Sequence, residues 1–393
     1  MIRPPRLGTQ RQIPSPSTGR RLLDAQRLKD SFAHVAMHGD EVPLFFYADL
    51  FLHHPETRDL FPVSMAHQRG RLVQALATTV SNVDNLETLR PLLEDLGRDH
   101  RKFGAVAAHY PAVGNSLLTT LAHFCGDGWT EDLASDWAAA YEIIAQVMVQ
   151  AAREDEAHRP AYWDATVMAH ERRRFDIAVL RLAVEEPLEY LPGQSVSMES
   201  SKRPRLWRFY SMANAPRPDS TMDFHVRMLD GGALSSHLAR GLEVGGRLRI
   251  GSPVGTLTYD GQSARDVLLV AGSTGLAPLK AILEQISGQA DPPRVHLFFG
   301  ASTADGLYDL PDLEKLAAQF PWLTVVPSVS REPGFPGERG SLPDVVARSG
   351  TWRDHDAYVS GPTGMVEATM QQLLAQGVPE NQIRVEDFGW SEG

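Results

Sequence analysis

The spacing of apolar residues changes twice along this chain, and that change constrains its fold more than any other feature. From 22 to 157 apolar side chains recur every three to four residues, the period of a helix with one buried face. From about 160 to 262, short runs alternate between apolar and polar residues, as in half-buried strands. From 265 onward, short apolar runs alternate with helical segments. The sequence therefore predicts three successive folding units of different class.

The first unit is expected to be all-α. Residues 41–60 carry a helical pattern that His53-His54-Pro55 interrupts, and the pattern over 66–80 is interrupted at 82–86. Further helical runs are expected over 89–103 and 131–157. Several helices without intervening strands predict a helical domain with one buried core.

The second unit is expected to be a small antiparallel β-barrel. Its alternating runs are separated by glycine turns such as Leu191-Pro192-Gly193, Asp230-Gly231-Gly232 and Val244-Gly245-Gly246. Many short strands at this spacing are typical of sandwiches and barrels.

The third unit is expected to be a doubly wound α/β domain. Parallel strands are expected at 266–271, 294–299, 323–329 and 357–360, with helices at 278–286, 312–319 and 364–376. The expected boundaries are 1–21 for a disordered basic tail, 22–157 for the helical domain, 158–264 for the barrel and 265–393 for the α/β domain.

Composition excludes several classes of protein. The single cysteine, Cys125, excludes a disulfide framework and a cysteine-ligated zinc or iron–sulfur centre, and it favours a reducing, cytoplasmic location. The net charge of -11 argues against a nucleic-acid partner. No apolar stretch approaches the roughly 20 residues of a membrane-spanning helix, so no stable membrane insertion is expected. Five arginines in 1–21, with no apolar run after them, favour a disordered tail over a secretory signal.

Two glycine turns in the third unit have the form that binds nucleotides. One follows an apolar strand and contains Gly272, Thr274, Gly275 and Pro278; the other is Ser360-Gly361-Pro362. Glycines permit close backbone approach, and the helix that follows offers free N–H groups to a pyrophosphate. A plain strand-to-helix turn would show the same pattern.

Two segments of the barrel add context to these turns. Trp207-Arg208-Phe209-Tyr210-Ser211 lies on an expected strand, and 231–236 opens a short helix. In this order the four segments resemble the ferredoxin-reductase superfamily, with its Arg-x-Tyr-Ser flavin motif, glycine-rich diphosphate motif and nicotinamide motifs. The resemblance covers about 160–390 and implies FAD and either NADPH or NADH as cofactors.

The resemblance also implies roles for individual residues. Arg208 would pair with the flavin diphosphate, Tyr210 would stack on the isoalloxazine ring, and Ser211 would hydrogen-bond its N5 edge. Tyr190 matches another flavin-contacting tyrosine. The residues expected to hold the diphosphate at the helix start are Gly232, Ala233, Leu234 and Ser235. The structural alternative makes Tyr210 an ordinary core tyrosine and Arg208 a solvated charge.

Other cofactor-binding positions lie in the third unit. Ser360 stands where the superfamily has a cysteine, which keeps a small polar group beside the nicotinamide. Ser330 and Arg331 follow an expected strand where relatives often hold a 2′-phosphate, which favours NADPH. The resemblance also places Glu386 and Phe388 among the cofactor-binding residues.

His100 is the decisive residue of the helical unit. A lone histidine on an apolar helix face is usually a core or surface histidine, but Phe103 follows it and Tyr110 lies ten residues on. With Tyr47 and Phe61 earlier in the chain, this arrangement resembles the globin domain of bacterial flavohaemoglobins, over about 22–157.

The globin resemblance implies haem b, with His100 as the proximal iron ligand and Tyr110 supporting it. Tyr47 and Gln68 match the distal tyrosine and glutamine, which can donate hydrogen bonds to bound dioxygen. The residues that match the rest of the haem pocket are Phe61, Leu72 and Phe103. His67 is a rival distal group; Gln68 is preferred because it shares a face with Leu72 and Leu76, whereas His67 aligns with Arg71 on the polar side.

Three departures indicate a divergent subgroup. The family's glutamate on the last globin helix falls at Ala152, with Glu154 two positions away. The lysine before the proximal histidine is Asp99, so its usual ion pair with Glu386 cannot form. The loop between Phe61 and Gln68 is shorter than in the family.

The resemblance implies a single-chain flavohaem oxidoreductase. NAD(P)H would reduce FAD, FAD would reduce the haem iron, and haem-bound dioxygen would oxidise nitric oxide to nitrate. The departures keep two alternatives open: an oxidoreductase that acts on a peroxide, a quinone or an organic substrate, and a sensor of dioxygen or nitric oxide whose reductase resets the iron. Dioxygen and nitric oxide are the expected small-molecule partners of a monomer.

Overall fold

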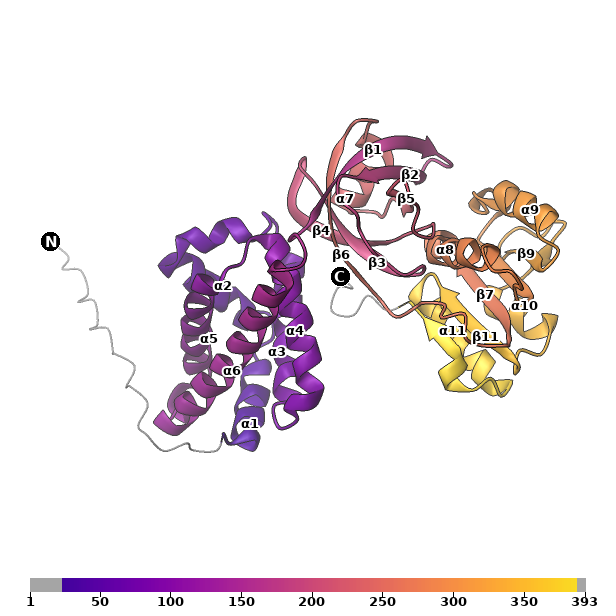
Figure 1. The fold of residues 1–393 in the computed structure, drawn as a ribbon. Helices are drawn as coiled ribbons and strands as arrows, with labels where there is room; N and C mark the ends of the chain where they lie inside the picture. The colour runs from indigo at the N-terminus through magenta and orange to yellow at the C-terminus, as the bar shows by residue number, and fades with distance from the viewer. Residues whose placement is uncertain (1–22, 387–393) are drawn as a thin grey trace.

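The computed structural model describes residues 23–386, without the side chain of His67. The tail expected over 1–21 and Phe388 lie outside the described residues. Figure 1 shows three units in succession: a bundle of helices, a curved antiparallel sheet and a parallel sheet flanked by helices. This order confirms the three expected fold classes.

The helical unit contains six main helices. They are α1 (Ala25–Ala36), α2 (Glu41–His53), α3 (Ala66–Ser81), α4 (Leu86–His100), α5 (Tyr110–Cys125) and α6 (Glu131–Glu156). Side-chain caps start several of them: Asp24 accepts from the Arg27 N–H at α1, and Thr130 accepts from the Leu133 N–H at α6. After α4 the chain makes one further 3₁₀ turn, Arg101–Phe103, which ends at Gly104 with a left-handed φ of 80°.

The second unit is a six-stranded antiparallel sheet in the order β4-β3-β6-β1-β2-β5. Its strands are β1 (Trp163–Arg172), β2 (Ile177–Val184), β3 (Ser195–Ser200), β4 (Arg203–Ser211), β5 (Thr221–Arg227) and β6 (Arg247–Val254). A bridge between Met212 and Phe224 joins the β4 and β5 edges, so the sheet curls toward a barrel. A short helix, α7 (Ala233–Ser236), packs against β4.

The third unit is a parallel sheet in the order β10-β9-β8-β7-β11-β12. Its strands are β7 (Asp266–Gly272), β8 (Val295–Ala301), β9 (Leu323–Val329), β10 (Glu338–Arg339), β11 (His355–Ser360) and β12 (Ile383–Val385). Its helices are α8 (Leu276–Ser287), α9 (Leu310–Gln319), α10 (Leu342–Ser349) and α11 (Thr363–Ala375). The strand order reverses between β7 and β11, so the crevice at their carboxyl ends is the expected place for a ligand.

Burial explains why β7 reads as an uninterrupted apolar run. Val267, Leu269 and Ala271 pack with α8 and α9 on one face, whereas Leu268 and Val270 pack with α10 and α11 on the other. A strand covered on both faces has no polar side to expose.

Candidate functional site

His100 lies at the carboxyl end of α4, with its Nδ1 2.6 Å from the carbonyl oxygen of Leu96. A carbonyl only accepts, so Nδ1 carries the proton and Nε2 presents a lone pair. Burial lowers the pKa of His100, against the opposing effect of Asp99, and this favours the neutral imidazole. A neutral imidazole whose second nitrogen is held by a backbone carbonyl is the form that binds iron, so His100 fits a haem ligand.

A tyrosine and two phenylalanines line the region between α2 and α3. The Tyr47 hydroxyl lies 3.4 Å from the carbonyl oxygen of Gln68, and its ring packs 5.4 Å from Phe61 and 5.8 Å from Phe51. Leu72 packs against the same core. Burial raises the pKa of Tyr47, so the phenol keeps its proton and remains a donor. The structure thus brings Tyr47 and the backbone of Gln68 together with the pocket residues Phe61 and Leu72. The His67 side chain lies outside the described part of the chain.

The imidazole of His100 bonds to a backbone carbonyl, and among the described residues no carboxylate takes that place. Glu154 points to solvent, where it accepts from Gln150 at 2.6 Å. Tyr110 packs with Met148 at the α4–α6 contact, and its carbonyl accepts from the Tyr141 hydroxyl at 2.7 Å. A neutral acceptor draws less on the imidazole proton than a carboxylate does, so less electron density reaches the ligand nitrogen.

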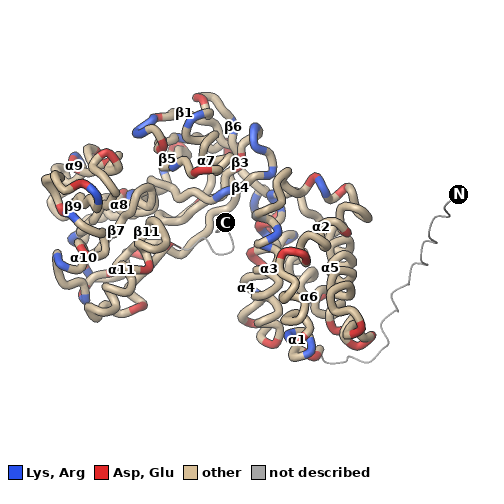
Figure 2. Tube along the Cα trace, turned by 180° about the vertical axis from the view of Figure 1, so that it is seen from behind, with Lys and Arg blue, Asp and Glu red and all other residues tan. Residues whose placement is uncertain are grey.

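Arg71, on the polar side of α3, lies close to the barrel. Burial and the neighbouring Arg208 lower the pKa of Arg71, while Asp99 raises it. Figure 2 shows basic positions gathered between α3 and the strands β3 and β4. The helical unit and the barrel therefore meet through a seam rich in cations.

The flavin motif lies on β4, as expected. Arg208 is half-buried, donates from Nη1 to the Trp207 carbonyl at 2.8 Å, and has no carboxylate partner among the described residues. Beside β4, the start of α7 is tightly folded: a Cβ on Gly232 would lie 2.4 Å from the Ser235 hydroxyl, which accepts from the Leu229 N–H at 3.2 Å. A half-buried guanidinium that has no described carboxylate partner, beside a compact glycine turn, fits the diphosphate of FAD.

Tyr190 and Tyr210 are held differently. The Tyr190 hydroxyl donates to the Asn214 carbonyl and accepts from the Asn214 amide, both at 3.0 Å, so this hydroxyl serves the fold and only its ring is left for a flavin contact. Tyr210 packs at the edge of the barrel core, and burial raises its pKa. Stacking of Tyr210 on the flavin stays a prediction.

Glu386 joins the flavin and nicotinamide motifs. Its carboxylate accepts from the hydroxyls of Ser211 on β4 and Ser360 on β11, the latter at 2.5 Å, and it lies 3.4 Å from the Ser195 hydroxyl on β3. Asp99, meanwhile, pairs with Lys102. The absence of an ion pair between Asp99 and Glu386 stays a prediction. Sequence reasoning missed both Ser195 and Lys102. No local motif marks the contact of Ser195 with Glu386 or that of Lys102 with Ser197, because these partners lie far along the chain.

The two nucleotide turns pack on each other at the carboxyl ends of β7 and β11. A Cβ on Gly275 would lie 2.5 Å from the Gly361 nitrogen and the Ser360 carbonyl, and one on Gly272 would lie 2.9 Å from Pro362. Thr274 and Pro278 lie in the same turn and the first turn of α8. Ser330 and Arg331 are exposed just beyond β9 at the same edge of the sheet, where contact with a 2′-phosphate stays a prediction.

Replacing Gly275 by alanine is expected to cost about 1–3 kcal/mol of stability and to raise the KM for NAD(P)H, because the new methyl group meets backbone that cannot move aside. Thermal unfolding and steady-state kinetics measure both effects. Gly364→Ala is the matched control: no atom lies within 4 Å of its Cβ position on α11. Equal behaviour of the two variants would show that the close approach of the turns is unimportant.

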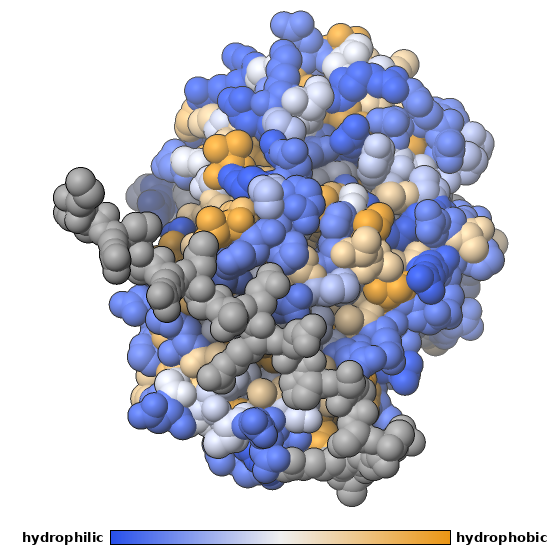
Figure 3. Space-filling view, turned by 90° about the vertical axis from the view of Figure 1, so that its left-hand side faces the viewer, coloured by the Kyte–Doolittle hydropathy of each residue, from blue (hydrophilic) through white to orange (hydrophobic). Residues whose placement is uncertain are grey.

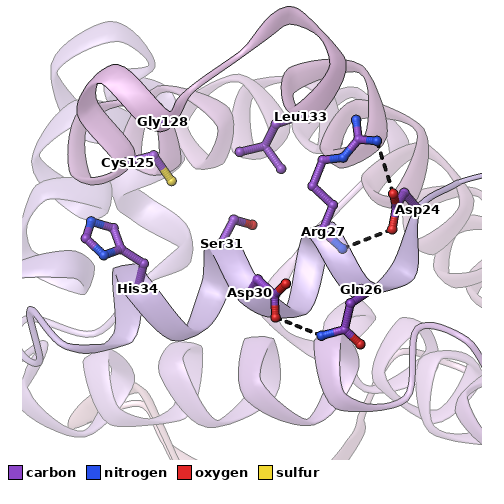
Figure 4. A pocket seen from close by; sticks show the side chains of 9 residues that line it. All are labelled: Asp24, Gln26, Arg27, Asp30, Ser31, His34, Cys125, Gly128 and Leu133. Carbon is purple, nitrogen blue, oxygen red and sulfur yellow. Dashed lines mark hydrogen bonds and ion pairs between the residues drawn. The ribbon is translucent and has the colours of Figure 1, made fainter.

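A separate open pocket of about 640 Å³ lies on the helical unit, between α1 and the α5–α6 connection. Figure 4 shows polar and apolar residues in its walls, among them Asp30, His34 and Leu133, and none of the predicted site residues lines it. The side of the molecule in Figure 3 is mostly hydrophilic, with apolar side chains in small separate groups. Over the described residues, no helix is long and apolar enough to span a bilayer.

Comparison with protein families agrees with this division of the chain. Residues 44–148 match the Globin family, residues 164–259 the oxidoreductase FAD-binding domain family and residues 269–371 the oxidoreductase NAD-binding domain family. Together these matches cover all three folding units.

Individual relatives match either the whole chain or its reductase half. A flavohemoprotein of Halalkalibacterium halodurans is 27% identical, over 93% of this chain and 95% of its own length. Another relative, from Ralstonia sp, is the ferredoxin–NAD(P)(+) reductase component of naphthalene 1,2-dioxygenase/salicylate 5-hydroxylase systems. It is 35% identical, over 57% of this chain and 68% of its own length. The crystal structure of a flavohemoglobin from Malassezia yamatoensis shares the fold, with a TM-score of 0.76 at 17% identity over 95% of this chain and all of that one.

The domain order, the two cofactor-binding halves and the whole-length relatives all indicate the same family. The chain belongs to the flavohemoprotein family, as an NAD(P)H-dependent oxidoreductase in which a haem-binding globin domain is joined to an FAD- and NAD(P)-binding reductase.

Proposed function

We propose that this enzyme is a nitric oxide dioxygenase, which consumes NAD(P)H, dioxygen and nitric oxide and releases nitrate. Per molecule of NAD(P)H, two molecules each of dioxygen and nitric oxide would give two nitrate ions, NAD(P)⁺ and one proton. The observation that most supports this activity is the buried, protonated Tyr47 hydroxyl beside Gln68, in the same domain as a histidine held in its iron-binding form.

When bound, haem supplies a redox-active iron for dioxygen, and FAD supplies the conversion between the electron pair of NAD(P)H and single electrons. The chain's own residues position the reacting groups and exclude water. Tyr47 offers a hydrogen-bond donor, while Phe51 and Phe61 keep water from it. On the reductase side, the Glu386 carboxylate orients the hydroxyls of Ser211 and Ser360.

Further parts of the proposal concern organisation. The domain boundaries at 22–157, 158–264 and 265–393 are supported by the change from helix to strand between Glu156 and Trp163 and by the start of β7 at Asp266. We propose that the enzyme is a monomer. We propose that it uses NADPH, because Ser330 and Arg331 are exposed at the sheet edge. A cytoplasmic location is proposed from the single cysteine.

Tyr47→Phe is expected to speed dioxygen dissociation about tenfold or more and to depress nitric oxide consumption, because a hydrogen bond to a polarised ligand contributes about 1.5–3 kcal/mol. Stopped-flow measurement of dioxygen release from the reduced enzyme gives the rate. Tyr141→Phe is the control, since its side chain is half-buried in the same globin domain but its hydroxyl donates to the Tyr110 carbonyl. An unchanged rate in Tyr47→Phe would assign the donor role to Gln68 or His67.

One observation favours a second candidate, an oxidoreductase for another acceptor. The His100 imidazole bonds to the Leu96 carbonyl rather than to a carboxylate, which makes the ligand less electron-donating. Rapid mixing of the oxygenated enzyme with nitric oxide separates the candidates: a slow reaction beside fast turnover of a peroxide or quinone would favour the second. Tight dioxygen binding without turnover of any substrate would instead favour a sensor.

A further inference from the structure

Lys102 crosses from the globin domain into the barrel. It lies in the 3₁₀ turn Arg101–Phe103 that follows His100, and its side chain is only 3% exposed. The ammonium group pairs with Asp99 and donates to the Ser197 hydroxyl on β3 at 2.9 Å, although Ser197 is 95 residues further along the chain. A lysine buried this completely between two domains costs desolvation that its partners must offset.

Three aromatic rings complete the surroundings of this ammonium group. Its Nζ lies 5.1 Å from the centroid of Phe103, 5.3 Å from that of Trp207 and 5.2 Å from that of Phe209. Phe103 belongs to the globin domain, whereas the other two lie on β4, so cation–π attraction acts from both sides of the seam. We call Ser197, Phe103, Trp207 and Phe209 the lysine box.

The lysine box contacts the candidate haem ligand and shares a strand with the flavin motif. On the globin side, the Phe103 ring packs edge-on to His100 at 6.2 Å and to Trp207 at 6.3 Å. On the barrel side, Trp207 and Phe209 alternate with Arg208 and Tyr210 along β4. The first pair therefore lies on one face of the strand and the second pair on the other. A shift of Lys102 would therefore displace both the proximal histidine and the strand that carries the flavin motif.

The barrel makes room for this lysine at Gly251 on β6. A Cβ there would lie 2.3 Å from the Ser197 hydroxyl and 3.4 Å from Cδ of Lys102. The ladder between β3 and β6 is irregular between Val196 and Met198, at the same place. A glycine inside a strand commonly marks the close approach of another group, and here that group is the lysine stem.

We propose that Lys102 is a positioning residue for electron transfer: it fixes the turn that carries the proximal histidine on the FAD-binding sheet, so that the two cofactor sites keep one relative placement. This role rests on transfer of electrons from the reductase half to the haem, and it does not depend on which molecule the haem then acts upon.

Lys102→Met tests the proposal, because it keeps an unbranched stem and removes the ammonium group. With haem and FAD still bound and ferricyanide reduction by NADPH unchanged, reduction of the haem after anaerobic mixing with NADPH should slow about tenfold or more, since small misplacements have effects of this size. Hydrogen–deuterium exchange should speed up in 99–104, 195–200 and 203–211. Because no nitric oxide is used, failure of the proposed dioxygenase activity leaves this result readable.

Lys315→Met is the matched control, since Lys315 pairs with Asp312 at the same spacing of three residues, at 2.9 Å, but is 77% exposed. It should change neither haem reduction nor exchange. Gly251→Ala is a second variant that enters the lysine box from β6, and it should reproduce the slow haem reduction if Lys102→Met does not fold. Normal haem reduction and normal exchange in either folded variant would overturn the proposal.

Discussion

His100→Ala should abolish stable haem binding while FAD stays bound and NAD(P)H still reduces artificial acceptors. The imidazole is the one iron ligand that the proposal assigns to the globin domain, and its Nδ1 is already oriented by the Leu96 carbonyl. The flavin motif lies on β4, in a barrel with a hydrophobic core of its own. The ratio of Soret to flavin absorbance in the purified protein measures the loss directly.

His123→Ala is the control for this variant. His123 lies on α5 in the same domain, but its ring stacks on Phe45 at 4.2 Å. It should keep its haem. A normal five-coordinate ferrous spectrum in His100→Ala would contradict the ligand assignment and direct the search to His109 or His123.

Arg208→Ala should have the reciprocal effect and weaken FAD binding while the globin domain keeps its haem. Loss of a charge-assisted contact removes about 1.5–3 kcal/mol, which is roughly a tenfold to hundredfold increase in the dissociation constant. The effect belongs at the upper end of this range, because Arg208 is half-buried and no described carboxylate shares its charge. Fluorescence titration of the apo-reductase with FAD gives the constant.

Arg203→Ala controls for the loss of an arginine from the same strand. Arg203 is exposed at the start of β4 and donates to the Lys202 carbonyl. Its removal should leave FAD affinity unchanged. If Arg208→Ala bound FAD as tightly as this control, Arg208 would not be a diphosphate ligand.

Periodicity predicted the main elements because burial of one face dictates the spacing of apolar residues. The helices over 66–81 and 131–156 and the strand over 323–329 are found within a residue or two of their expected limits. The α10 helix and the three-residue strand β12 were not anticipated. Both are short: α10 has eight residues, and β12 has three, which pair with β11.

The residues of the candidate site also divide into those that a local pattern reveals and those that it does not. Tyr47, Arg208 and Gly275 were identified because each belongs to a short segment of recognisable spacing. Contacts such as Lys102 with Ser197, or Ser211 with Glu386, join residues 95 and 175 positions apart, and no local pattern encodes them. Arg71 shows the same limit: its spacing places it on the polar side of its helix, but no local pattern indicates that Arg208 of the barrel lies near it.

Ser360 has a consequence for the chemical durability of the enzyme. It is fully buried, and its hydroxyl donates to Glu386 in the place where related reductases carry a thiol. The chain's one cysteine, Cys125, lies at the end of α5, and burial raises the pKa of its thiol. Sulfenylation and S-nitrosylation both need a reactive thiolate. A reductase centre built on serine is therefore closed to these two routes of inactivation, whatever reactive oxygen or nitrogen species its own turnover releases.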